Sequence, residues 1–418
     1  MIVFEHAHVL DAAAGTLLKD RFRRVDGAAT AEDSERPVAA EGARRIDARG
    51  KVLMPGLIDC HVHCLASHVS LGRMVQMPNV LAALRAVPVL RGMIDRGFTT
   101  VRDAGGADFS LAEATRTGVV AGPRIFPSGK GLSQTGGHGD FRERSDTLDP
   151  CACTSRIGAI ARVVDGVDAV RRAVREEIQK GATQIKIMAS GGVASPNDPI
   201  HFLGYSEDEI RAIVEEAANA DTYVMAHAYT PRAIMRAVRC GVRTIEHGNL
   251  VDADAARVMA DCGAIAVPTL ATYEALATEG ASFGLPPAAV AKTAAVRGDG
   301  LRSLEIFARA NVRMAFGTDL LGESQRLQSE EFALRAGVLG AAEAIRAATV
   351  HAAHVLRRDG RLGVVTPGAI ADLLLVDGNP LENIDLLRGQ GDRLLLIMKD
   401  GRLHKDLVQG TRHDPQAS

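Results

Sequence analysis

Six residues of this chain carry side chains that are metal ligands or can become one, and each closes a short apolar run that predicts a β-strand. They are His61, His63, Lys186, His227, His247 and Asp319. Imidazole nitrogens and carboxylate oxygens bind divalent cations such as Zn²⁺, and a lysine supplies an anion once its amine is modified. The set predicts a site for two divalent metal ions held close together.

His61 and His63 stand two residues apart in the first of these runs. Side chains alternate between the two faces of a strand, so both imidazoles point to the same side and could bind one ion. The same spacing also occurs where a strand simply leaves the core. His6 and His8 repeat it, and we assign them no role.

Lys186 lies between Ile185 and Ile187 in an apolar run. Burial disfavours the ammonium form and therefore lowers the pKa of a lysine. A neutral amine can react with CO₂ to give a carbamate, which is a bidentate anion able to bridge two metal ions. For a lysine taken alone, the alternatives are a side chain that extends to the surface or one that pairs with a carboxylate.

His227, His247 and Asp319 end three further runs. A histidine at a strand end is often a hydrogen-bonded structural residue, and an aspartate there is often the cap of the next helix. The joint pattern is stronger evidence than any one residue, because five predicted strands each end in a group that can bind metal. We therefore assign all six residues to one site.

Eight apolar runs predict the strands that position these residues, and helical segments lie between many of them. The runs cover residues 53–63, 98–106, 123–129, 184–192, 222–229, 244–249, 265–272 and 313–319. A helix is expected at 168–180 with Gly181 as its stop, and another after a capping box of Ser206 and Glu209. The alternation predicts an α/β fold of the (β/α)8 TIM barrel type, whose active sites lie at the C-terminal ends of the strands. A doubly wound sheet is the alternative, but no Gly-x-Gly-x-x-Gly follows the first strand.

The two ends of the chain are similar in kind and differ from the middle. Short strand-like runs occur in residues 1–53 and again in 366–405, where Asp377-Gly378 and Asp400-Gly401 are turn signals. We expect residues 1–55 and 360–418 to build one small β-sandwich domain, beside a metal-dependent (β/α)8 barrel of residues 56–359. The polar stretch 27–44 is expected to be a loop.

Composition excludes several classes of function. The 418 residues include 49 basic and 51 acidic ones, so charge gives no reason to expect nucleic acid or an anionic membrane as a partner. Tryptophan is absent and aromatic residues make up 4%, which argues against a stacking platform for RNA. The start shows no signal-peptide pattern and no run reaches membrane-spanning length, so we expect a cytoplasmic protein. Six cysteines are too few for a disulfide scaffold, and Cys151 and Cys153 are interpreted as loop thiols.

The sequence resembles the amidohydrolase superfamily across nearly its whole length. PGLIDCHVH at 55–63 is similar to the opening motif of that superfamily, GTD at 317–319 to its closing motif, and ADL at 371–373 is also characteristic. KIMASGG at 186–192 and GGHG at 136–139 resemble the Xaa-Pro dipeptidase and carboxypeptidase group, which includes ochratoxin-hydrolysing amidohydrolases. The resemblance implies the binuclear branch of the superfamily, in which the barrel lysine is carboxylated.

This resemblance implies a role for each candidate residue. His61, His63 and Asp319 would hold one ion, His227 and His247 the other, and a carbamate on Lys186 would bridge them; Zn²⁺ is the expected metal. A hydroxide between the ions would attack the amide carbonyl, and Asp319 would carry a proton to the leaving amine. His138 and Tyr229 resemble positions that contact the free carboxylate of the leaving amino acid.

The function expected from the sequence is hydrolysis of the amide bond in dipeptides or N-acyl amino acids with a free C-terminal carboxylate, with ochratoxin A as one candidate substrate. A homo-oligomer, as large as an octamer, is implied by the same resemblance. One alternative is a cyclic-amide hydrolase or a deaminase of the imidazolonepropionase type, which binds one metal and lacks the lysine ligand. Another is a non-catalytic assembly protein on a decayed hydrolase barrel. Such proteins have lost metal ligands, whereas none of the six is missing here.

Overall fold

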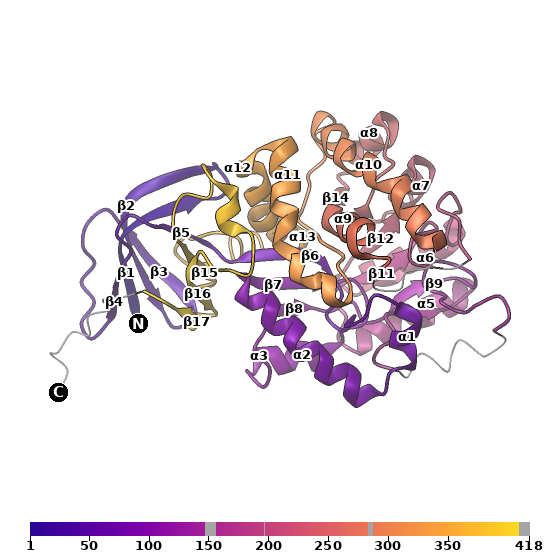
Figure 1. Cartoon of the computed structure of the whole chain (residues 1–418), viewed down its shortest axis with the longest axis horizontal. Helices are drawn as coiled ribbons and strands as arrows, with labels where there is room; N and C mark the ends of the chain where they lie inside the picture. Colours follow the sequence, from indigo (N-terminus) through magenta and orange to yellow (C-terminus); the bar gives the residue numbers. More distant parts are fainter. Residues whose placement is uncertain (147–155, 196, 283–286, 409–418) are drawn as a thin grey trace. The chain divides into compact units, whose positions relative to one another are not determined.

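The computed structural model describes residues 1–146, 156–195, 197–282 and 287–408, which form two compact units (Figure 1). The first unit comprises Met1–Asp59, Arg91–Thr100 and Phe332–Ser418, and the second comprises Cys60–Leu90 and Val101–Glu331. The domain boundaries expected from the sequence stay predictions. Cys151 and Cys153 lie outside the described residues.

The first unit contains one eight-stranded sheet to which both ends of the chain contribute. Its strands are β1 (Ile2–Asp11), β2 (Thr16–Asp26), β3 (Ala29–Ser34), β4 (Arg44–Asp47), β5 (Val52–Pro55), β15 (Leu373–Val376), β16 (Leu394–Lys399) and β17 (Arg402–Asp406). The order is β17-β16-β15-β5-β1-β2-β3, with β4 paired to β1. The two-sheet packing of a β-sandwich stays a prediction. The loop predicted for 27–44 is wrong at β3, because residues 29–34 pair with β2 despite their polar side chains.

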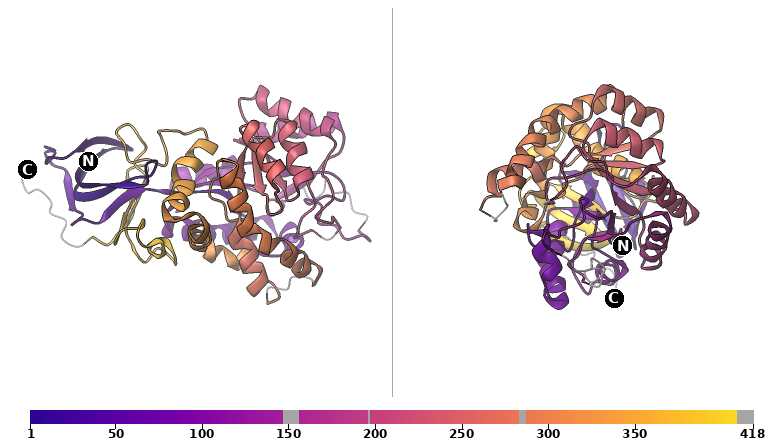
Figure 2. Two further views of the ribbon diagram at one scale, coloured as in Figure 1. Left: turned by 90° about the horizontal axis from the view of Figure 1, so that it is seen from above. Right: turned by 90° about the vertical axis from the view of Figure 1, so that its right-hand side faces the viewer.

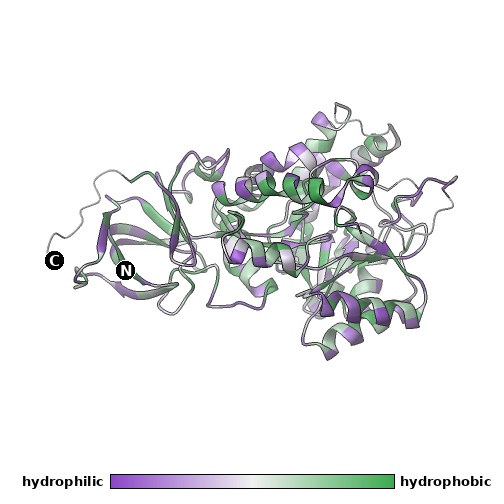
Figure 3. Ribbon diagram, turned by 90° about the horizontal axis from the view of Figure 1, so that it is seen from below, coloured by the Kyte–Doolittle hydropathy of each residue, from purple (hydrophilic) through white to green (hydrophobic). Residues whose placement is uncertain are grey.

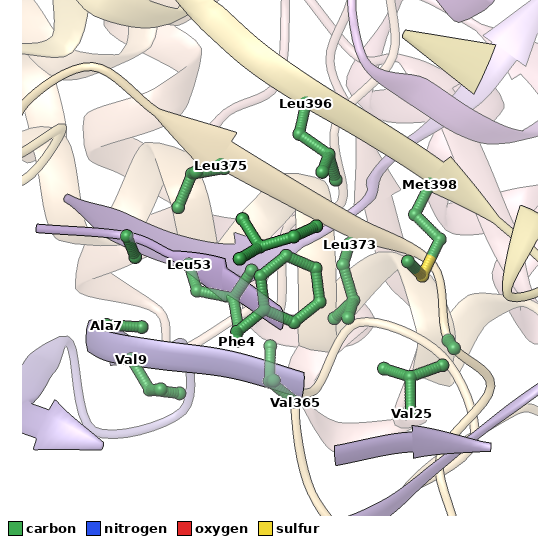
Figure 4. Close-up of a cluster of buried hydrophobic side chains, with 13 residues drawn as sticks. Phe4, Ala7, Val9, Val25, Leu53, Val365, Leu373, Leu375, Leu396 and Met398 are labelled. Atoms are coloured by element: carbon green, nitrogen blue, oxygen red, sulfur yellow. The ribbon is translucent and has the colours of Figure 1, made fainter. Parts of the chain in front are cut away.

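The two ends of the chain are joined by backbone pairing and by a common core. Strand β15 pairs antiparallel with β5, so that Leu374 lies opposite Met54. Phe4, Leu53 and Leu396 are fully buried in one apolar cluster of this sheet (Figure 4). Burial of apolar surface is the main force that stabilises such an arrangement. The short helices of this unit are α11 (Glu331–Leu339), α12 (Ala341–Arg346), a π-helix (Ala347–His351), α13 (Ala352–Val355) and η3 (Ile384–Leu387).

The second unit is built on short strands that carry the candidate site residues at or near their ends. One three-stranded sheet has the order β6 (Leu57–Val62), β7 (Phe98–Asp103), β8 (Arg124–Phe126). A six-stranded parallel sheet has the order β10 (Ala161–Val163), β9 (Gly131–Ser133), β11 (Ile185–Met188), β12 (Val224–Ala228), β13 (Thr244–His247), β14 (Ile265–Val267). Seven of the eight predicted runs contain a strand, whereas β9 and β10 were not predicted.

The eighth predicted strand, residues 313–319, is not a regular strand. It forms a single parallel bridge between Met314 and Ala266. Its backbone still bonds on two sides, since the Ala315 amide donates to the Ala266 carbonyl at 2.9 Å and the Phe316 carbonyl accepts from the Cys60 amide at 2.7 Å. The segment turns at Asp319, whose φ of 53° lies in the left-handed region. The segment therefore lies between β14 and β6 without forming a regular ladder with either.

Helices lie on the outside of the strands of this unit (Figure 2). They are α1 (Leu71–Gln76), α2 (Asn79–Asp95), α3 (Phe109–Arg116), α5 (Val167–Gln179), α6 (Glu207–Asn219), α7 (Pro231–Arg239), α8 (Ala253–Asp261), α9 (Leu270–Glu279), α10 (Pro287–Arg309) and η1 (Gly322–Glu330). Hydrophilic and hydrophobic residues alternate along them, as expected for helices with one buried face (Figure 3).

Two local predictions are confirmed within this unit. Helix α5 matches the helix expected at 168–180 within one residue at each end, and α6 begins with both hydrogen bonds of the capping box between Ser206 and Glu209. Among the described residues, we find no helix with the length and apolar character needed to cross a membrane.

Candidate functional site

The six predicted metal ligands meet at one end of the strands of the second unit. They line a single cavity of about 40 Å³. His61 lies near the end of β6 and His63 directly after it, Lys186 lies in β11, His227 in β12, and His247 at the end of β13. Asp319 follows the irregular segment that runs between β14 and β6. Residues up to 258 positions apart in sequence (319 − 61) therefore share one cavity.

Asp319 is the centre of this cluster. Its Oδ1 atom lies 3.4 Å from Nε2 of His61 and 3.1 Å from Nε2 of His63, and its Oδ2 atom lies 3.9 Å from Nδ1 of His247. One ligand atom each from His61, His247 and Asp319 lie within 4.8 Å of one another. Nitrogen and carboxylate oxygen donors at such spacing fit a divalent metal ion such as Zn²⁺.

Each candidate histidine has one ring nitrogen within hydrogen-bond distance of a polar partner other than Asp319. Nδ1 of His61 lies 2.7 Å from Oε2 of Glu246, Nδ1 of His63 lies 3.0 Å from the Gly105 carbonyl, and Nδ1 of His247 lies 2.7 Å from Oγ1 of Thr269. Nε2 of His227 lies 3.1 Å from the Gly191 carbonyl. A carbonyl or carboxylate oxygen requires an N–H donor, so in the neutral ring the lone pair of His61, His63 and His227 is on the other nitrogen. That arrangement is typical of metal-binding histidines.

Glu246 forms a hydrogen bond with His61 and is itself paired with the buried cation Arg102. Its carboxylate accepts hydrogen bonds from Nη2 of Arg102 at 2.9 and 3.0 Å and from Oγ1 of Thr244 at 2.5 Å. Burial alone would raise the pKa of Glu246, but the charge of Arg102 and the hydrogen bond from His61 lower it to about 2. Glu246 therefore stays anionic at the base of the site.

Sequence analysis did not identify Glu246, Arg102 or Asp103 as site residues. The carboxylate of Asp103 accepts hydrogen bonds from the backbone amides of Cys64, Gly105 and Ala107. These bonds fix the loop whose Gly105 carbonyl orients His63. A signal was present, because a charged residue inside an apolar run is costly unless it is paired. Both Glu246 and Arg102 lie inside such runs, but their partners are distant in the chain.

Lys186 is buried, with 2% of its surface exposed. Burial lowers its pKa to about 8, although the charges of Glu246 and Asp319 oppose that change. The neutral fraction near neutral pH is therefore larger than for an ordinary lysine, and the neutral amine is the form that reacts with CO₂.

Protonation of the other ligands is also shifted toward the forms that bind metal. Burial lowers the pKa of His227 and of His247 well below the usual value. Burial would raise the pKa of Asp319, but the neighbouring histidines lower it well below its usual range. His63 differs, because its hydrogen bond to Asp319 raises its pKa against the effect of burial.

Two of the candidate ligands have a strained backbone. His247 has φ of 71° and Asp319 has φ of 53°, a left-handed conformation that is unfavourable for residues other than glycine. Such a conformation costs on the order of 1–3 kcal/mol and persists only where surrounding contacts impose it. For Asp319, one such contact is the hydrogen bond from its backbone amide to the His61 carbonyl, at 2.8 Å. Strain at two residues of one cavity is typical of a functional site.

His138 and Tyr229 lie next to the metal ligands in different ways. His138 lines the cavity and stacks on His227 with ring centroids 4.2 Å apart. The ring of Tyr229 also contacts His227, with centroids 4.7 Å apart. Its hydroxyl lies 2.7 Å from the hydroxyl of Tyr273, a residue that sequence analysis did not identify. Apolar side chains form the rest of the cavity wall; they are Leu71, Phe141, Ile160, Met188, Ala194 and Leu321.

Several known proteins are similar to this chain over most of its length. Ochratoxinase from Aspergillus niger is 33% identical over 370 residues, which cover 85% of this chain and 76% of that protein. A crystal structure of a prolidase complexed with N-methylphosphonate-L-proline is 61% identical, with a TM-score of 0.96 over 97% of this chain and 99% of that chain. A Xaa-Pro dipeptidase with bound methionine in the active site is 29% identical, with a TM-score of 0.85 over the same shares.

Residues 52–403, which are most of the chain, match the sequence model of the amidohydrolase family. Members of this family are generally metal-dependent, and the His/Asp cluster is a possible metal site of that kind. The sequence resemblance is thus confirmed. This chain belongs to the amidohydrolase family and is a hydrolase that acts on amide bonds.

Proposed function

We propose that this chain is a binuclear metal-dependent dipeptidase that releases a C-terminal amino acid, with proline as its preferred leaving group. The observation that carries the proposal is the convergence of six metal-competent side chains on one cavity. The choice of proline is supported by the 61% identical prolidase complexed with a proline phosphonate. A phosphonate on the proline nitrogen is tetrahedral and so resembles the transition state for cleavage of an acyl-proline bond.

N-acyl amino acids, including ochratoxin A, are the second substrate class in this proposal. Support comes from the 33% identity to ochratoxinase. The cavity wall is apolar on the side of Leu71, Phe141 and Ile160, which suits an apolar acyl group. These side chains would therefore contact an apolar residue or an aromatic acyl group before the cleaved bond.

We also propose that β6, β7, β8, β11, β12, β13, β14 and residues 313–319 form one (β/α)8 barrel. Residues 313–319 supply the support, because their backbone bonds to β14 on one side and to β6 on the other. Gln184 gives further support, since its side-chain amide donates to the carbonyls of Asp103 and Phe126. Parallel strands of a barrel place their carboxyl ends together, which is where the site lies. Assembly into a homo-oligomer stays a prediction.

In this proposal His61, His63 and Asp319 hold one ion, His227 and His247 hold the other, and Lys186 bridges them as its carbamate. Two Zn²⁺ ions bound there would lower the pKa of a water molecule to about 7 and polarise the substrate carbonyl. Glu246 and Gly105 favour the tautomer of His61 and His63 that carries the lone pair on Nε2, the nitrogen that would coordinate the ion.

Asp319 moves the proton in the proposed mechanism. Its pKa lies well below the usual range, so it is ionised and would accept a proton from the attacking water. The same carboxyl then gives the proton to the amide nitrogen as the C–N bond breaks, and the amine leaves neutral. His138 and Tyr229 bind the free carboxylate of the departing amino acid.

Metal content and substrate profile test the proposed function together. We expect about two divalent ions per chain, and the fastest cleavage for Xaa-Pro dipeptides in a library that includes N-acyl amino acids and ochratoxin A. One ion per chain with turnover of cyclic amides or imidazolones would instead support the deaminase-like alternative. A chain that binds no metal and cleaves none of these compounds would support a non-catalytic role.

A further inference from the structure

The loop that follows β11 supplies hydrogen-bond partners to two site histidines. Its base is closed by two backbone bonds, from the Gly191 amide to the Phe202 carbonyl at 3.0 Å and from the Gly204 amide to the Ala189 carbonyl at 2.9 Å. The Gly191 carbonyl lies 3.1 Å from Nε2 of His227. The position of this loop therefore bears directly on the site.

Asp198 organises the turn of this loop from within. Its side chain is buried, with 3% of its surface exposed. Its carboxylate accepts from the Gly192 amide at 2.8 Å and from the Ser195 hydroxyl, and it lies 3.4 Å from Nδ1 of His138. Oγ of Ser195 also lies 2.7 Å from Nδ1 of His138. Asp198 and Ser195 together occupy that ring nitrogen.

Lys292 of α10 fixes the same turn from outside. Its Nζ atom lies 3.0 Å from each of the carbonyl oxygens of Gly192, Ser195 and Asp198. An ammonium group has three N–H donors, so these three carbonyls use all of them. Lys292 therefore has no donor left for a substrate carboxylate.

The ring of His138 has two close neighbours, His227 and Gly192, besides the groups at Nδ1. One face stacks on His227 at an interplanar angle of 22°. Gly192 approaches the ring so closely that an added Cβ would lie 2.1 Å from Cε1 of His138, and no side chain fits there. The ring is therefore locked in place by the loop, and Nε2 is the nitrogen that remains for a ligand in the cavity.

We propose that Lys292 and Asp198 are positioning residues, which hold Gly192 and Ser195 of this loop so that His138 presents Nε2 to the carboxylate of the leaving amino acid. This inference rests on the proposed function of His138. It assigns Lys292, on a distant helix, to specificity for substrates with a free C-terminal carboxylate. It also gives Lys292 a role that does not require contact with the substrate.

Kinetics of Lys292→Met and Asp198→Asn, with metal content and fold checked, test the proposal. The measured quantity is KM for an Xaa-Pro dipeptide divided by KM for its C-terminal amide. We expect this ratio to rise about 10-fold or more in both variants, as is typical for loss of a buried hydrogen bond to a charged group. Two ions per chain should be retained. Arg309→Met is the matched control, because Arg309 lies exposed on the same helix and pairs only with Glu305 among the interactions described.

Backbone hydrogen exchange supplies a readout that does not depend on turnover. The amides of Gly191 and Gly204 should exchange at least about 10-fold faster in Lys292→Met than in the wild type or Arg309→Met, because the bonds that close the loop then open more often. An unchanged KM ratio, or an equal loss for acid and amide, overturns the specificity role. Unchanged exchange overturns the positioning role. If the wild type cleaves neither substrate, the proposed function fails, and exchange still decides whether Lys292 holds the loop.

Discussion

The Oε2 atom of Glu246 lies 2.7 Å from Nδ1 of His61, and both side chains are buried. Glu246 precedes His247, so two adjacent residues of β13 serve the same site in different ways. Adjacent side chains of a strand point to opposite faces. Both reach the site because the backbone leaves the strand at His247, where φ is 71°.

Replacement of Glu246 by glutamine should weaken metal binding about 10- to 100-fold, because the outer hydrogen bond that orients His61 loses its charge. It should also destabilise the fold by about 3 kcal/mol, since Arg102 is left as a buried cation without its carboxylate. Chelator competition measures the first effect and denaturant unfolding the second. The control is Glu113→Gln, which breaks an exposed pair with Arg116 and should change neither quantity. Unaltered metal affinity in Glu246→Gln would remove the assigned role.

Asp319→Asn should lower kcat by about 1,000-fold or more while most of the metal stays bound. The amide oxygen can still coordinate, but asparagine cannot accept and return a proton. Single-turnover kinetics and metal analysis of the same preparation separate the two effects. Activity close to that of the wild type would contradict the proton-transfer role.

Reconstitution of the metal-free chain should depend on pH through Lys186. Its pKa is lowered to about 8, so the neutral, CO₂-reactive amine grows as pH rises through 8. At fixed dissolved CO₂ and Zn²⁺, the rate of activation should rise with pH and reach half of its maximum near pH 8. A midpoint near 10.5, the ordinary lysine value, would show that burial does not tune this group. Lys186→Gln should fail to regain the second ion at any pH.

Tyr229→Phe should raise KM for substrates with a free C-terminal carboxylate by about 10-fold and leave their amides unaffected. The hydroxyl of Tyr229 bonds that of Tyr273 at 2.7 Å, so the two hydroxyls are expected to act as a pair. Tyr273→Phe should therefore produce a smaller effect of the same kind. Equal changes for acids and amides would instead indicate that Tyr229 only packs beside His227.

Local patterns in the sequence were enough to predict several elements. Ser206 and Glu209 form the predicted capping box because its hydrogen bonds join residues three apart. The strands with Lys186 and His227 were predicted because each is a short apolar run between turn signals. The prediction of a regular strand at 313–319 was wrong. Pairing there depends on distant segments, which form only a single bridge at Met314, and the chain turns at Asp319.

The sequence by itself determined the types of ligand and the ends of strands that carry them, because a metal-competent residue at the end of an apolar run is a local feature. Only the tertiary structure decided which residues support those ligands. Glu246 was recognised through His61, Arg102 through Glu246, and Lys292 through three backbone carbonyls of a loop about 100 residues earlier. These contacts depend on burial and on segments that approach one another only after folding, so no spacing in the chain encodes them.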